Sequence, residues 1–276
     1  MIIRKSCVDG LFYEANPILL REEIEDMFSH VGGEDSRGDV VAGIVPHAGY
    51  VYSGKTACYT FKEIMKGKLP DTFIVLGPNH TGRGTMIDVC DFEKWETPLG
   101  LVNVDREFIG ELLNIDSNVY IDNNAHVREH SIEVEVPLIQ YICEGHDFKI
   151  VPIVVSQQIP SLCESLAKSL DTVVRKLNRK CVILASTDLT HYEDEETANF
   201  LDNKVIDSVN SMDMKRLVKD IIEYDITMCG YGPVITATTY CKLQNANSPK
   251  VLNHTTSGEA SGDYDSVVGY MSAIIK

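Results

Sequence analysis

Two short runs of small and β-branched apolar residues constrain the fold of this chain most, because both end in the same kind of polar turn. Residues 40–45 read V-V-A-G-I-V and continue directly into P-H-A-G, which contains His47. Residues 72–77 read T-F-I-V-L-G and continue into P-N-H-T-G, which contains His80. Continuous apolar runs of this length are typical of strands that are buried on both faces of a sheet. In open α/β sheets, ligands bind at the carboxyl ends of such strands, where both histidines are expected.

The rest of the chain alternates predicted strands with predicted helices, which favours an α/β fold. We expect a three-layer αβα domain in which helices cover both faces of a mainly parallel or mixed central sheet. The sequence contains no internal repeat, low-complexity tract or linker, so a single domain is expected over residues 1–276. A Gly- and charge-rich loop is predicted at 30–39. Other strands are predicted at 148–155, 180–187, 250–256 and 266–274, and helices at 53–65, 160–177, 193–212, 213–222 and 234–243.

The segment from 125 to 143 supports two interpretations. Ser131 is a candidate N-cap of a helix, and the apolar residues after it fit a period of 3.6. The alternation I-E-V-E-V would equally suit a strand. His126 and His130 could supply a general base or a lid contact, but we interpret them as polar residues at a helix start. Glu133 and Glu135 are interpreted as a solvated face.

Composition excludes several classes of function. The formal net charge is −16 and lysine and arginine are not clustered, which disfavours nucleic acids and anionic membranes as partners. No apolar run approaches the roughly 20 residues of a membrane helix. The start M-I-I-R-K lacks the features of a secretory signal, so we expect a cytoplasmic protein. The eight cysteines include no C-x-x-C pair, and most are expected to be buried free thiols.

Potential metal ligands and proton carriers follow several of these elements. D-L-T-H, with Asp188 and His191, follows the strand predicted at 180–187, and Cys229 lies in the turn M-C-G-Y-G-P. Imidazole, carboxylate and thiolate groups are the side chains that bind transition metals. A lone histidine after a strand usually has a structural role, but this set makes metal binding or acid–base catalysis an equal alternative. Nucleotide-binding glycine motifs and a G-x-S-x-G nucleophile elbow are absent from the sequence.

Seven motifs, taken together and in order, resemble the Memo family over nearly the whole chain. They are L-F-Y-E-A-N-P, P-H-A-G-Y-V-Y-S-G, L-G-P-N-H-T-G, W-E-T-P-L-G, E-H-S-I-E-V-E-V-P, S-T-D-L-T-H-Y and M-C-G-Y-G-P. The resemblance implies a fold related to the class III extradiol dioxygenases, which are non-haem iron enzymes. It also implies a functional link to a radical-SAM protein, with which prokaryotic Memo proteins are often grouped.

The resemblance further implies a metal site formed by His47, His80 and Cys229. Asp188 and His191 would lie beside it, and His130 would lie near the same pocket, as candidate catalytic groups. In the dioxygenases the third ligand is a carboxylate, so the cysteine here argues against classical ring cleavage. A thiolate favours Zn(II) or copper over iron, whereas Asp188 as third ligand would restore an iron site.

Three functional hypotheses follow from the sequence and the resemblance. The first is an Fe(II)-dependent redox protein or oxidoreductase with an unidentified substrate. The second is a non-catalytic protein that binds a small molecule or a peptide in the same pocket. The third is a zinc-dependent hydrolase, in which Asp188 or His191 handles the proton of a metal-bound water.

Overall fold

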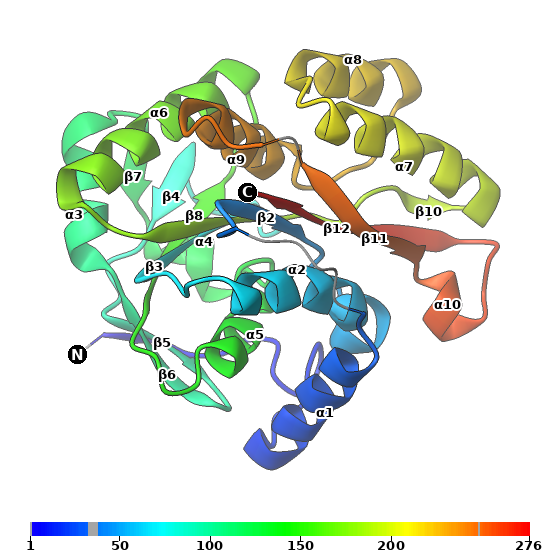
Figure 1. Ribbon diagram of the computed structural model, residues 1–276, viewed down its shortest axis with the longest axis horizontal. Helices are drawn as coiled ribbons and strands as arrows, with labels where there is room; N and C mark the ends of the chain where they lie inside the picture. Colours follow the sequence, from blue (N-terminus) through cyan, green and yellow to red (C-terminus); the bar gives the residue numbers. More distant parts are fainter. Residues whose placement is uncertain (1, 33–37, 248) are drawn as a thin grey trace.

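The central sheet is mixed, with parallel strands in its middle and antiparallel pairs on either side of them, as a computed structural model of the chain shows (Figure 1). The structure describes residues 2–32, 38–247 and 249–276, so the loop predicted at 30–39 lies partly outside the described residues. The strand order is β1-β5-β6-β8-β3-β9-β2-β12-β10, with β11 on β12 and β4 bridging β7 and β8. The strands span Ile3–Arg4 (β1), Ala42–Val45 (β2), Thr72–Pro78 (β3), Ile87–Val89 (β4), Lys94–Thr97 (β5), Gly100–Val104 (β6), Val119–Ile121 (β7), Lys149–Val155 (β8), Cys181–Ser186 (β9), His191–Glu193 (β10), Lys250–Thr256 (β11) and Val267–Ile275 (β12).

Helices cover both faces of this sheet, which confirms the predicted three-layer αβα arrangement. In Figure 1, α1, α2 and α5 lie below the sheet, and α6, α9 and the α7–α8 hairpin lie above it. Among the described residues, no helix is both long enough and apolar enough to cross a membrane. The helices span Pro17–Ser29 (α1), Lys55–Lys66 (α2), Arg106–Ile115 (α3), Asn123–Val127 (α4), Glu135–Ile142 (α5), Pro160–Leu177 (α6), Glu195–Asn210 (α7), Met214–Tyr224 (α8), Tyr231–Leu243 (α9) and Gly258–Ser261 (α10).

The strands that position the site are β2, β9 and β3, which are adjacent and parallel. All three are almost entirely buried, as their continuous apolar sequences predict. Because the strands run in the same direction, the segments that follow them emerge at one edge of the sheet. Gly77 of β3 is required there, since a Cβ at this position would lie 2.3 Å from the Ser131 hydroxyl. The absence of a side chain lets the 129–134 loop pack directly on the strand.

The segment from 125 to 143 adopts neither predicted form completely. A short helix, α4, is followed by a turn region, and α5 begins only at Glu135. The prediction that Glu133 and Glu135 form a solvated face is wrong, because both side chains are fully buried. His126 is also buried, beneath Trp95, and its Nε2 lies 3.1 Å from the carbonyl oxygen of Asp88. The alternating pattern did not predict this because the buried partners come from distant segments: Arg4 pairs with Glu133, and Ser186 contacts Glu135.

Candidate metal centre

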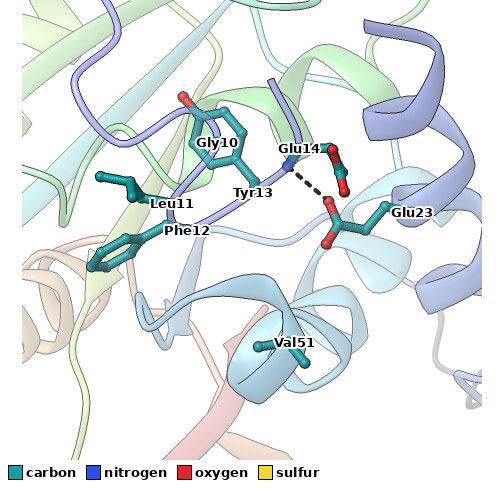
Figure 2. A pocket seen from close by; sticks show the side chains of 7 residues that line it. All are labelled: Gly10, Leu11, Phe12, Tyr13, Glu14, Glu23 and Val51. Atoms are coloured by element: carbon teal, nitrogen blue, oxygen red, sulfur yellow. Dashed lines mark hydrogen bonds between the residues drawn. The ribbon is translucent and has the colours of Figure 1, made fainter. Parts of the chain in front are cut away.

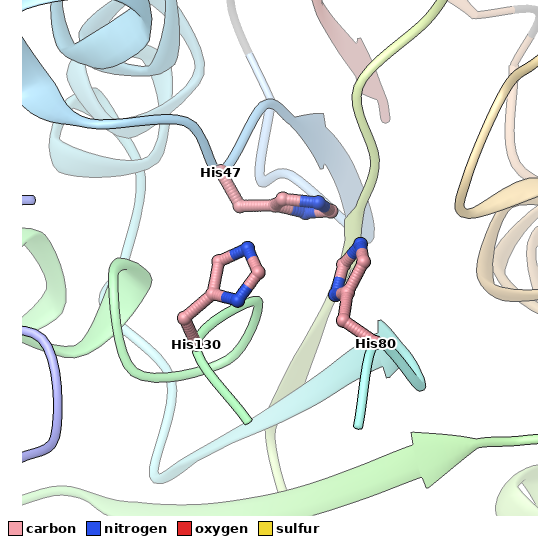
Figure 3. Close-up of side chains that lie close together, drawn as sticks. All are labelled: His47, His80 and His130. Atoms are coloured by element: carbon pink, nitrogen blue, oxygen red, sulfur yellow. The ribbon is translucent and has the colours of Figure 1, made fainter. Parts of the chain in front are cut away.

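Three histidines from three different loops converge at the carboxyl edge of the sheet (Figure 3). His47 follows β2 and His80 follows β3, so the parallel strands bring the two turns together. His130 comes from the loop between α4 and α5, which packs across the end of β3. The ring centroids of His47 and His80 lie 5.1 Å apart, and those of His80 and His130 lie 4.5 Å apart.

The arrangement of these imidazoles fits a single metal ion. One ring nitrogen from each of the three histidines lies within 4.8 Å of the others. Two nitrogens bound to one ion at about 2.1 Å lie at most about 4.2 Å apart, so small side-chain rotations would complete the site. Among the described residues, this is the only group of three potential ligands found to converge in this way. A set of imidazoles suits zinc, copper, iron or nickel and does not by itself distinguish them.

Glu129 orients His80, a role that the sequence did not indicate. Its carboxylate lies 2.6 Å from the backbone nitrogen of His80 and 2.9 Å from the Nδ1 atom of the same residue. It also accepts a hydrogen bond from the backbone N–H of Ser131, at 2.9 Å. Burial opposes ionisation of Glu129, but the hydrogen bonds and charge of His80 outweigh it and lower the pKa to about 2. A carboxylate on Nδ1 leaves Nε2 of His80 free to bind a metal.

A buried ion pair holds the loop that carries His130 in place. Arg4 and Glu133 form this pair, and their side chains are 1% and 0% exposed. Arg4 also donates to the backbone carbonyl of Glu129, at 2.8 Å, and its guanidinium lies 4.3 Å from the Trp95 ring centroid. Tyr13 donates its hydroxyl to Glu133 at 2.7 Å. The start of the chain therefore fixes a loop more than 120 residues away.

Cys229 lies beside the three histidines rather than within their converging group. Its Sγ is 3.3 Å from Nε2 of His47 and accepts a hydrogen bond from the backbone N–H of Asp188, at 3.2 Å. Burial raises the pKa of this thiol well above its usual range, so the metal-free protein holds it protonated. A metal would have to displace that proton for Cys229 to become a ligand.

Asp188 and His191 border the same cluster. Asp188 Oδ1 accepts the backbone N–H of His47 at 2.8 Å, and Oδ2 lies 3.9 Å from His47 Nε2. Burial raises the pKa of Asp188 to about 7, where it can exchange a proton near neutrality. His191 lies in β10, and its Nδ1 is buried with no hydrogen-bond partner among the described residues. Both residues line the pocket that opens onto the histidines.

That pocket has a volume of about 420 Å³. Its polar groups are the three clustered histidines with Asp188 and His191, and its apolar wall includes Phe12, Tyr52, Tyr192 and Tyr270. Tyr52 lines the pocket, whereas Tyr50, two residues earlier, is buried in the core.

A second pocket, of about 170 Å³, lies across the segment of Leu11 and Phe12, which line both (Figure 2). Its carboxylates are Glu14 and Glu23, and the backbone N–H of Glu14 donates to Glu23 at 3.1 Å. Two carboxylates without a third ligand make it a weaker candidate for a metal site than the histidine pocket.

The buried histidines predict that acid destabilises the metal-free protein. Burial lowers the pKa of His126 and of His130 from 6.5 to about 4, and lowers that of His47 well below 6.5. At these three positions the unfolded chain takes up protons that the native state does not, so the contribution of the histidines to the free energy of unfolding should fall from about pH 6.5 to about pH 4. The raised pKa values of Asp188 and Glu135 act in the opposite sense and offset part of this fall. Urea unfolding of the metal-free protein at several pH values measures this.

The variant His130→Phe should flatten part of that pH dependence, whereas His30→Asn, at an exposed position, should leave it unchanged. Equal slopes for His130→Phe and the wild type would contradict the assignment of a neutral, buried His130.

The fold and the site together define a three-layer α/β protein with a candidate three-histidine metal centre at the carboxyl edge of its sheet. The sequence profile described as Memo-like protein matches residues 4–274. The chain is 43% identical to a MEMO1 family protein of Sulfolobus acidocaldarius, covering 98% of both chains. It is 41% identical to a MEMO1 family protein of Methanobrevibacter smithii, covering 100% of both. The chain belongs to the Memo family, as its motifs predicted.

Among solved structures, the chain resembles that of JW3007, an uncharacterized protein of Escherichia coli K12. The TM-score is 0.58 at 12% sequence identity, and the match covers 85% of this chain and 98% of the other. Identity this low supports the shared fold alone.

Proposed function

We propose that this protein is a metal-binding redox protein or oxidoreductase that uses Fe(II) and acts on a small molecule in the histidine pocket. The convergence of His47, His80 and His130 in a pocket of about 420 Å³ carries this proposal. Three neutral nitrogen ligands leave further coordination positions for Cys229, Asp188 or a substrate. Copper and zinc fit the same ligands, and iron is favoured by the resemblance to non-haem iron enzymes.

Each group at the site has a distinct role under this proposal. A bound Fe(II) supplies one-electron chemistry. Glu129 holds the His80 ring and presents its Nε2 to the pocket. Asp188, with a pKa of about 7, takes or gives a proton beside His47. His191, at the start of β10, is a second group for proton transfer. The aromatic wall excludes water from a bound molecule and favours a flat or apolar one.

The second candidate function is ligand binding without turnover, and the aromatic lining of the pocket favours it. It predicts that a bound small molecule or peptide raises the melting temperature while no product forms. Steady oxygen consumption with a catecholic or related substrate would rule it out. Oxygen-insensitive hydrolysis by a zinc-loaded protein would instead favour the third candidate, a zinc-dependent hydrolase.

Metal analysis of anaerobically purified protein tests the proposed site. The double variant His47→Ala/His80→Ala should lose nearly all of the metal that the wild type retains, because two of three converging nitrogens are removed. His30→Ala removes an exposed histidine outside the pocket and serves as the matched control. Equal metal content in the double variant and the wild type would contradict the proposal.

A further inference from the structure

The hydroxyl of Ser186 lies at the centre of a buried hydrogen-bond network behind His47. Its Oγ is 2.7 Å from His47 Nδ1, 2.7 Å from the backbone oxygen of Ser131 and 3.2 Å from Glu135 Oε1. Ser186, His47 and Glu135 are all at most 1% exposed. One hydroxyl proton must therefore satisfy contacts with three polar neighbours.

The chemistry of these neighbours determines where the protons lie. A backbone carbonyl can only accept, so the hydroxyl of Ser186 donates its proton to Ser131. The oxygen of Ser186 is then left with two lone pairs and must accept from both other neighbours. His47 Nδ1 at 2.7 Å therefore carries a hydrogen, and the contact with Glu135 is favourable only if that carboxyl group donates as well.

Glu135 is placed to be such a donor. Among the described residues, no lysine, arginine or histidine forms an ion pair with it, and its Oε2 is buried without a hydrogen-bond partner. An ionised carboxylate with a bare buried oxygen would be strongly unfavourable, whereas a neutral acid leaves only a carbonyl-like oxygen unpaired. Burial raises the pKa of Glu135 well above its usual range, in agreement with this arrangement.

We propose that Ser186, held by the Ser131 carbonyl and by a protonated Glu135, is a positioning residue that keeps His47 in the Nδ1–H tautomer. The lone pair of His47 Nε2 then faces His80, His130 and the thiol of Cys229, which lies 3.3 Å away. Neither Ser186 nor Glu135 lines the pocket, so both act on the site only through this relay. The effect of the relay on metal affinity rests on the proposed metal site, but the tautomer exists without metal.

The proposal is tested first in the metal-free wild type at neutral pH. Nitrogen-15 NMR of the His47 ring should show a protonated Nδ1 and an unprotonated Nε2. Carbon-13 NMR should show a protonated carboxyl resonance that disappears in Glu135→Gln. An ionised Glu135 carboxylate, or a His47 ring protonated on Nε2 alone, would overturn the proposal, and neither measurement depends on a variant that alters the His47 site.

Substitutions then separate the relay from simple packing. Glu135→Gln retains an N–H donor to Ser186 and should leave the His47 tautomer and the affinity for Co(II) at wild-type values. Ser186→Ala removes the acceptor of the His47 Nδ1–H group and should give a mixture of tautomers and roughly 10-fold to 100-fold weaker Co(II) binding. Equal tautomer populations in both variants would show a packing role and refute the relay.

Failure of the relay and failure of the metal site give different results. If the Nδ1–H tautomer is present but neither the wild type nor any variant binds Co(II), the proposed function fails and the relay stands. If Co(II) binds equally well to the wild type and to Ser186→Ala, the relay fails and the metal site stands.

Discussion

Arg4→Met is expected to lower the free energy of unfolding by about 3–5 kcal/mol, because it leaves the carboxylate of Glu133 buried without a cation. Both side chains are at most 1% exposed, so water cannot replace the lost partner. Methionine replaces the apolar stem of arginine and lacks its guanidinium. The loss therefore measures chiefly the missing charge and hydrogen bonds. Urea unfolding of the metal-free protein gives the value.

Arg21→Met is the matched control for this prediction. Arg21 pairs with Glu144 at the surface, where the two side chains are 41% and 68% exposed. Exposed pairs contribute at most about 1 kcal/mol, so this variant should remain close to the wild type. The double variant Arg4→Met/Glu133→Gln should recover part of the loss by removing the unpaired charge. A cost for Arg4→Met no larger than that of Arg21→Met would contradict the importance of the buried pair.

Glu129→Gln is expected to weaken Co(II) binding by roughly 10-fold to 100-fold, the range typical of residues that orient metal ligands. The two carboxylate oxygens of Glu129 face three N–H groups, namely the backbone N–H and the Nδ1–H of His80 and the backbone N–H of Ser131. An amide in this position must turn its NH₂ group toward one of these donors. If it faces His80 Nδ1, the ring gives up that hydrogen and carries it on Nε2, where the metal would bind.

Anaerobic titration with Co(II) measures this affinity, with Glu144→Gln as the exposed control of identical chemistry. The control should bind as the wild type does. An unchanged affinity in Glu129→Gln would show that His80 either does not bind the metal or does not need this carboxylate to orient it.

The sequence was sufficient to predict the sheet and two of the three converging histidines. His47 and His80 each follow an apolar run long enough to require burial on both faces, and such strands align in parallel beneath helices. The turns after neighbouring parallel strands must then meet at one edge. This inference needs only the local pattern of apolar residues and the geometry of a parallel sheet.

The same local reasoning failed for the segment E-H-S-I-E-V-E. Alternating glutamates predicted an exposed face for Glu133 and Glu135, yet both are buried, and so is the neighbouring Glu129. Each is compensated by a residue far along the chain: His80, Arg4 and Ser186 respectively. No periodicity within the segment encodes these contacts.

The sequence by itself thus determined which strands are buried and which polar turns lie at their ends, because burial of apolar side chains is a property of a local pattern. Only the tertiary structure decided that His130 joins His47 and His80 and that Cys229 lies beside them. It also decided that Glu129, from the loop of His130, orients the His80 ring. The physical reason is that a buried charge is stable only with a partner, and these partners are brought together by folding.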